Sequence, residues 1–166
     1  LNGEELWTFQ YDPVELVLSE NWSMLEAQHS ISFFHDLLWM QTNDCHIFAF
    51  DPFTGEVKNE ILNTCSDVPG NSGKYVGHYS PTFFETIIIS RVSAGGGGGR
   101  SFIAGYDEFN GRLLWQWFSV PPSGGDPEWD FKDAAKGNIS PYPGDWGEND
   151  LIGGGSIFSL VAVDES

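Results

Sequence analysis

The chain has 166 residues, of which 40% are hydrophobic and 15% aromatic, so it can bury the core of a folded domain. Its 24 acidic residues against 7 Lys and Arg give a formal net charge of -17. Phosphate backbones and anionic lipid surfaces repel such a chain, and its apolar runs are too short for a membrane span of ~18 residues. We therefore expect no nucleic-acid partner and no membrane span.

The expected secondary structure is all β. No segment has a sustained helical period, whereas short segments rich in β-branched and aromatic residues recur between turn residues. Residues 121–155 hold five of the nine prolines and many glycines, which predicts one long loop. In chain order, the expected strands are Val14–Leu18, Leu37–Met40, His46–Phe50, Val57–Leu62, Phe83–Ser90, Ser101–Tyr106, Arg112–Phe118 and Ser156–Val163.

A turn motif recurs along the chain. Its glycines, Gly3, Gly55 and Gly111, are 52 and 56 residues apart, and Asn or Thr precedes each of them. Glycine adopts positive φ, and Asp or Asn side chains bond their own backbone within a turn, so each motif predicts a hairpin. The expected turns lie near 2–7, 51–57 and 107–115, and from 164 onward.

Hairpins repeating at this period predict a β-propeller of four-stranded blades, with a β-sandwich as the alternative. At about 55 residues per blade, the 166 residues hold about three blades, whereas closed propellers usually have four to eight. We therefore expect residues 1–166 to form one partial propeller domain whose partner is the remainder of a longer propeller. Trp7 and Trp115, which recur with the turn, are expected to pack between neighbouring blades.

The acidic composition bears on the location of the protein, whereas the two cysteines say little about it. An excess of carboxylates suits either high salt or low pH, and both favour an extracellular or periplasmic location. Two cysteines are too few for a disulfide scaffold. A bridge between Cys45 and Cys65 is geometrically possible but out of ideal register.

Three segments carry a more specific pattern. They are Tyr106-Asp107 with Asn110-Gly111, Leu113 and Trp115; Ser80-Pro81 followed by Ser93, Arg100 and Tyr106-Asp107; and Gly144-Asp145-Trp146 followed by Gly153-Gly154-Gly155-Ser156-Ile157-Phe158. In this order they resemble the quinoprotein alcohol dehydrogenases, eight-bladed propellers that bind pyrroloquinoline quinone (PQQ) and calcium. The resemblance covers almost the whole chain, and it implies about three blades of an eight-bladed propeller.

Carried over residue by residue, the resemblance implies an altered cofactor pocket. Ser93 matches a serine of the family pocket, but Gly96 stands where a glutamate ligand of calcium is expected. Phe158 replaces the tryptophan that stacks on the quinone, and His78 and His29 replace a threonine and an arginine that contact it. We therefore expect no cofactor and no metal, with PQQ and calcium bound if the pocket is only unusual.

Other polar residues have two interpretations each. The run of glycines from Gly95 can present backbone N–H groups to an anion, or it is a flexible loop. His29 and His78 can act as acid, base or anion holders facing a central channel, or they lie on the surface. Asp145 can activate water, or it is a solvated loop acid. His46 is expected on a strand surface rather than at a metal.

Three functions follow as expectations, and the sequence leaves open whether the chain is an enzyme. The leading one is an exported quinoprotein-like propeller whose emptied pocket hydrolyses a small sulfur oxyanion, as in the tetrathionate hydrolases of acidophiles. His78, His29 and Asp145 would be its catalytic residues, and Ser93, Gly95, Gly96 and Phe158 would line the pocket. The alternatives are a PQQ-dependent alcohol dehydrogenase with an alcohol substrate and a non-catalytic scaffold for protein assembly. A homo-oligomer is possible in each case.

Overall fold

The computed structural model shows an all-β chain, as expected. It describes residues 3–11, 30–61, 64–65, 75–77, 79–93, 101–119, 131–133, 137–139 and 161–163, with 131–133 and 137–139 described by their backbone alone. These residues form ten strands and no helix, so none of them lies in a helix that is long and apolar enough to cross a membrane. The expected strand at 14–18 lies outside the described residues, and 161–163, the described part of the strand expected at 156–163, are not in a strand.

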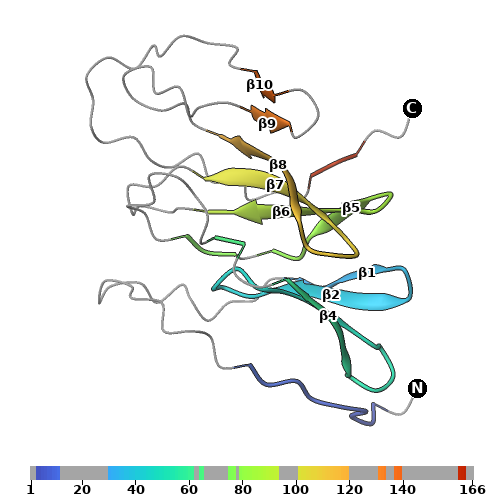
Figure 1. Ribbon diagram of the computed structural model, residues 1–166. Helices are drawn as coiled ribbons and strands as arrows, with labels where there is room; N and C mark the ends of the chain where they lie inside the picture. The colour runs from blue at the N-terminus through green and yellow to red at the C-terminus, as the bar shows by residue number, and fades with distance from the viewer. Residues whose placement is uncertain are drawn as a thin grey trace, which may run out of the picture.

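The first sheet has four antiparallel strands in chain order (Figure 1). They are β1 (Ser32–Phe34), β2 (Leu37–Gln41), β3 (Ile47–Phe50) and β4 (Val57–Ile61). The sequence pattern predicted β2, β3 and β4 but missed β1. This strand has three residues, and the turn after it is made by His35 and Asp36 at φ 46° and 60° without a glycine.

The second sheet repeats this arrangement and extends it. One long strand was expected over Phe83–Ser90, which is wrong because a turn at Glu85 and Thr86 divides it, with Glu85 at φ 50°. The single loop expected at 121–155 is also wrong in part, because a short hairpin within it pairs with the sheet edge. The strands are β5 (Thr82–Phe84), β6 (Ile87–Val92), β7 (Phe102–Asp107), β8 (Leu113–Phe118), β9 (Phe131–Asp133) and β10 (Gly137–Ile139).

The recurrent turn has the same hydrogen bonds in both sheets. The Asp51 carboxylate accepts the N–H groups of Phe53 and Thr54, both at 2.9 Å, and the Gly55 N–H donates to the Asp51 carbonyl at 2.9 Å. Asp107 repeats this pattern with Phe109, Asn110 and Gly111 at 2.9, 3.2 and 2.9 Å. Gly55 and Gly111 have φ of 72° and 68°, where glycine is favoured. The expected hairpins at 51–57 and 107–115 are therefore confirmed.

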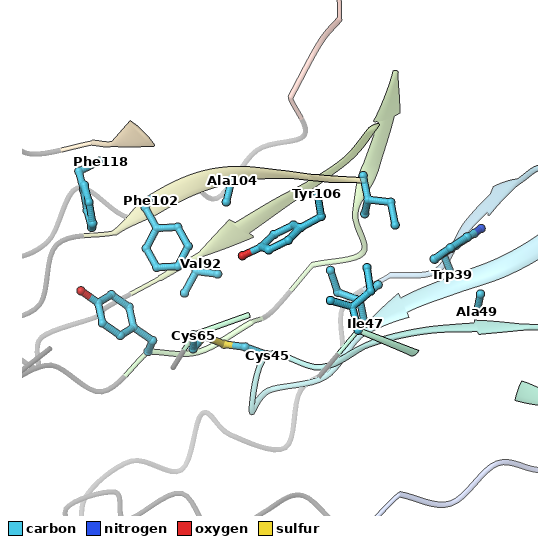
Figure 2. Packing of buried hydrophobic residues seen from close by; sticks show 13 residues of the cluster. Trp39, Cys45, Ile47, Ala49, Cys65, Val92, Phe102, Ala104, Tyr106 and Phe118 are labelled. Atoms are coloured by element: carbon cyan, nitrogen blue, oxygen red, sulfur yellow. A yellow bond between two sulfur atoms is a disulfide. The ribbon is translucent and has the colours of Figure 1, made fainter. Parts of the chain in front are cut away.

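The core lies between the two sheets (Figure 2). Alternate residues of β2, β3 and β7 pack into this core, as period-two strands with one face toward it require. In the first sheet Trp39, Ile47 and Ala49 are at most 1% exposed, and Phe102 and Ala104 of the second sheet are fully buried. The sheets thus pack face to face, as consecutive propeller blades do.

The N-terminal segment packs onto the first sheet through Trp7. Its indole N–H donates to the carbonyl oxygen of Pro52 at 3.0 Å, and its ring lies against Gly55. Asn59 makes the corresponding contact between the sheets, since its side-chain amide donates to the Glu108 carbonyl at 2.7 Å. Pro52 and Glu108 each follow the turn aspartate, so the two contacts are equivalent. The expected packing of Trp7 between repeat units is confirmed.

A second inter-sheet contact joins the β1–β2 turn to the β7–β8 turn. His35 Nδ1 lies 2.9 and 3.1 Å from the two carboxylate oxygens of Glu108. The Glu108 side chain is 8% exposed and that of His35 54% exposed, so water screens this pair from one side. It fixes the relative position of the two turns more than it adds to stability.

The contact between Trp7 and Gly55 predicts an unequal effect of alanine at the two turn glycines. A Cβ at Gly55 would lie 2.6 Å from the Trp7 ring, whereas one at Gly111 would lie 3.2 Å from the flexible side chain of Ile61. We expect Gly111→Ala to cost about 1 to 2 kcal/mol for the backbone alone, and Gly55→Ala about 2 to 4 kcal/mol. Urea unfolding of the two variants measures the difference, and equal losses would contradict the docking of Trp7.

The turn carboxylate also predicts a pH dependence. Backbone hydrogen bonds from Thr54 and Phe53 lower the pKa of Asp51. A lowered folded pKa means that the stabilisation is complete above the unfolded pKa, about 4, and is lost as pH falls through the folded pKa. The Tm of Asp51→Asn should therefore lie below that of the wild type at pH 7, with the gap closing toward pH 2. A gap that stays constant over this range would contradict the role of the charge.

Candidate binding site at the ends of β2 and β6

A tight turn follows β2 and shapes this end of the first sheet. The Thr42 N–H donates to the His46 carbonyl at 2.8 Å, and the Cys45 N–H donates to the Thr42 carbonyl at 2.9 Å. The Thr42 hydroxyl donates to the Asp44 carboxylate in a short hydrogen bond. Cys45 has φ 65°, which is strained for a side chain other than glycine. Hydrogen bonds and one disulfide hold this conformation.

The disulfide joins Cys45 to Cys65 with their Cα atoms 5.6 Å apart. Cys45 is fully buried and Cys65 is 8% exposed, and Figure 2 shows the bridge close to the inter-sheet core. The Thr64 N–H and hydroxyl both donate to the Cys45 carbonyl, at 2.8 and 2.7 Å. The bridge that sequence reasoning left open is therefore formed, because Cys45 lies in the turn, where the backbone can meet the segment after β4.

Residues 75–77 lie between the turn after β2 and the end of β6, and they bond to both. Val76 and Ser93 exchange two backbone hydrogen bonds of 2.7 and 3.0 Å, and the Gly77 N–H donates to the Asn43 carbonyl at 3.1 Å. A Cβ at Gly77 would lie 2.6 Å from the Thr42 carbonyl oxygen, so only glycine fits there without a shift. Residues 75–77 thereby separate the half-buried Ser93 from the turn after β2.

The starts of the edge strands β1 and β5 also meet. The Ser80 hydroxyl donates to the Ser30 carbonyl, the Ser80 N–H donates to the Ser30 hydroxyl at 3.0 Å, and the Ser32 hydroxyl donates to the Pro81 carbonyl at 2.7 Å. Beside them lies Arg91, which is 2% exposed and donates to the Ser80 carbonyl at 3.1 Å. Burial lowers the pKa of Arg91 from its usual value, yet arginine keeps its proton.

The Arg91 guanidinium also lies 4.8 Å from the centre of the Tyr79 ring. Cation–π attraction of this kind offsets part of the cost of burying a charge. A positive charge therefore lies beside Tyr79 and Ser80, and it favours negative charge nearby.

Another polar cluster lies on the opposite side of the turn. The Tyr11 hydroxyl donates to Asp44 at 2.8 Å and lies 2.9 Å from His46 Nδ1. Burial, and then the hydrogen bond to Asp44, raise the pKa of Tyr11, so its hydroxyl remains a donor. His46 therefore has a structural partner, and the described residues include no group of three or more His, Cys, Asp or Glu placed to hold a metal.

The predicted site residues are placed unevenly. Ser93 pairs with Val76, whose neighbour Gly77 bonds to the turn after β2. His29, His78, Gly95, Gly96, Asp145 and Phe158 lie outside the described residues and stay predictions. Their described neighbours Ser30 and Ser80 bond to each other across the two sheets.

Sequence reasoning missed Gln41, Asn43 and Arg91. Gln41 could have been noticed, because it continues the inward-facing alternation of Leu37 and Trp39 with a polar side chain. Arg91 likewise interrupts an apolar strand with a charge. Asn43 gives no comparable signal, since asparagine is common in turns.

Comparison with known proteins gives a consistent result, although no family model matches the chain. The quinohemoprotein alcohol dehydrogenase ADH IIB of Pseudomonas putida is 28% identical over 175 aligned positions, which cover 98% of this chain. The crystal structure of quinohemoprotein alcohol dehydrogenase from Comamonas testosteroni superposes with a TM-score of 0.52 and 27% identity over 66% of the chain. The chain is related to the quinoprotein alcohol dehydrogenases. The resemblance and the propeller-type fold expected from the sequence are thus confirmed.

A europium-containing methanol dehydrogenase is a further structural match, at 23% identity and a TM-score of 0.49 over 60% of the chain. The chain spans 22% of the length of the Pseudomonas relative and 15% of the Comamonas chain. It therefore corresponds to a part of these proteins.

The relationship corrects one expectation. We expected no cofactor, because Gly96, Phe158, His78 and His29 depart from the family pattern. That expectation is wrong, since the relatives matched over this region are named for the quinone and haem that they carry. The error came from inferring the loss of the cofactor from four exchanged side chains, although the chain spans only 22% of the length of the relative.

The disulfide predicts a specific ranking of variants. Closing a loop of 20 residues stabilises a protein by about 3 kcal/mol, so Cys45→Ala with Cys65→Ala should lose about that much. Cys45→Gly with Cys65→Ala should lose about 1 kcal/mol less, because glycine tolerates the φ of 65° at this position. Denaturant unfolding under non-reducing conditions measures both, and the reverse ranking would contradict the strained turn.

Proposed function

We propose that the chain forms consecutive blades of a PQQ-dependent alcohol dehydrogenase and supplies one wall of its quinone site. The similarity to a quinohemoprotein alcohol dehydrogenase over 98% of the chain is the observation that carries this proposal. The substrate would be an alcohol, and the rest of the propeller would complete the site.

The described residues suit a quinone bearing carboxylates. The ends of β2 and β6 offer the half-buried Ser93 and the buried amide of Gln41, and β6 also carries the buried positive charge of Arg91. Neutral donors and a nearby positive charge favour oxygen-rich anions. For calcium the described part of the chain offers no group of carboxylates, so its ligands would come from other residues.

Bound PQQ would supply the chemistry, since an ortho-quinone accepts two electrons and two protons as the alcohol becomes an aldehyde. The residues of this chain would hold and orient the quinone. Ser93 would donate a hydrogen bond from its hydroxyl, and Gly77 would let the neighbouring backbone approach closely. The departures at Gly96 and Phe158 would then bear on how tightly the quinone binds.

The disulfide supports an exported protein. Buried disulfides form and persist in oxidising compartments and are rare in the cytosol. Cys45 and Cys65 are both buried and bonded, so we propose a periplasmic or extracellular location. The hydrolase of sulfur oxyanions is set aside, because the relatives reported above are named as dehydrogenases.

The proposal is tested on the full-length protein by titration with PQQ and calcium, followed by tryptophan fluorescence. We expect saturable quenching and an alcohol-dependent reduction of an artificial dye by the loaded protein. Ser93→Ala should weaken PQQ binding about tenfold through the loss of one hydrogen bond to an anion.

Ser119→Ala is the matched control, because Ser119 lies after β8 and its hydroxyl donates to the Ser101 carbonyl. It should leave PQQ affinity unchanged. Absence of quenching in the wild type at millimolar PQQ, with calcium present, would overturn the proposed function.

A further inference from the structure

The inward face of β2 ends on a polar residue where an apolar one would be expected. Leu37, Trp39 and Gln41 alternate on this face, and Gln41 is 0% exposed. Its Oε1 accepts the Ser90 hydroxyl of β6 at 2.9 Å, so the carboxamide is held between the two sheets. A glutamine fixed in this way presents its other end, the NH₂ group, in one direction.

The NH₂ group of Gln41 faces Gly77. The Nε2 atom lies 2.7 Å from the position that a Cβ would occupy at residue 77, so the missing side chain leaves room for it. Nε2 is buried and has no hydrogen-bond acceptor in the part of the chain that the structure describes. A buried donor without an acceptor is costly, and native proteins rarely keep one without a use.

A second buried polar atom near Gly77 also lacks a hydrogen-bond partner among the described residues. Asn43 Oδ1 is buried, and no donor reaches it among the described residues. The Asn43 carbonyl accepts the Gly77 N–H at 3.1 Å, so Gln41 and Asn43 both contact Gly77. An unused donor and an unused acceptor therefore belong to two residues around Gly77, which directly follows the strand bridge between Val76 and Ser93.

We propose that Gln41 and Asn43 form part of the ligand site, where the Gln41 NH₂ donates to a ligand oxygen and Asn43 Oδ1 accepts a ligand N–H. This rests on the proposed function, because PQQ offers both groups in its carboxylates and its pyrrole N–H. The site takes a flat anion that presents an acceptor and a donor on one edge. Gln41 and Asn43 thus set specificity on the wall made by these two sheets.

The test compares Gln41→Met with a matched glutamine in the full-length protein. Gln116→Met is the control, since Gln116 is also buried, at 6% exposure, but lies in β8. PQQ titration by fluorescence should show affinity at least tenfold weaker for Gln41→Met and unchanged for Gln116→Met. Gln41→Met also removes the acceptor of the Ser90 hydroxyl, so the Tm is compared in a Ser90→Ala background. There the Tm of the PQQ-free Gln41→Met protein should equal or exceed that of Ser90→Ala alone, because the variant removes a buried donor that has no partner until the ligand binds.

Asn43→Ala gives an independent readout, with weaker PQQ binding expected and a smaller loss than for Gln41→Met. If the wild type binds PQQ and both variants bind it as tightly, this inference is overturned while the proposed function stands. If Gln41→Met lowers the Tm of the PQQ-free Ser90→Ala protein or prevents its folding, Nε2 serves an internal partner and the inference is overturned as well. Failure of the wild type to bind PQQ would instead remove the proposed function itself.

Discussion

The structure depends on one contact, the docking of a side chain from one repeat unit onto the turn of the next. Trp7 donates to the carbonyl after Asp51, and Asn59 donates to the carbonyl after Asp107. Such a contact needs a backbone carbonyl held at a fixed place, and the turn aspartate provides this by binding two N–H groups of its own turn. The spacing of the sheets follows from this geometry.

The two docking contacts differ in the side chain that makes them. Trp7 supplies a ring and an N–H, and Gly55 must lack a Cβ to receive the ring. Asn59 keeps the hydrogen bond without the ring, and Ile61 fills the space at Gly111 instead. Within the second sheet Trp115 packs against Gly105, whereas Asn59 faces Ala49 in the register of the first sheet. A tryptophan and a glycine thus occur together, because the indole ring occupies the space that the Cβ of any other residue would need.

The sequence could predict the elements whose causes are local. Asp51 and Gly55, like Asp107 and Gly111, make the turn with a side-chain carboxylate and a residue that lacks a Cβ, and the hairpins around them were predicted. The turns at His35 and Glu85 lack glycine or proline, so the short strand β1 was missed and β5 was merged with β6. The disulfide and the role of Gln41 depend on which segments meet in space. Gly77 reaches the turn after β2 only through the fold, and no spacing along the chain shows this.

The link through Thr64 has a consequence for how the protein opens. Tyr106 of the second sheet donates to the Thr64 carbonyl at 3.2 Å, while the Thr64 N–H and hydroxyl bond to Cys45 beside the disulfide. The segment after β4 is thereby covalently anchored to the first sheet and hydrogen-bonded to the second. The two sheets then open together as one cooperative unit. Amide hydrogen exchange in β3 and in β7 would therefore report the same free energy of opening.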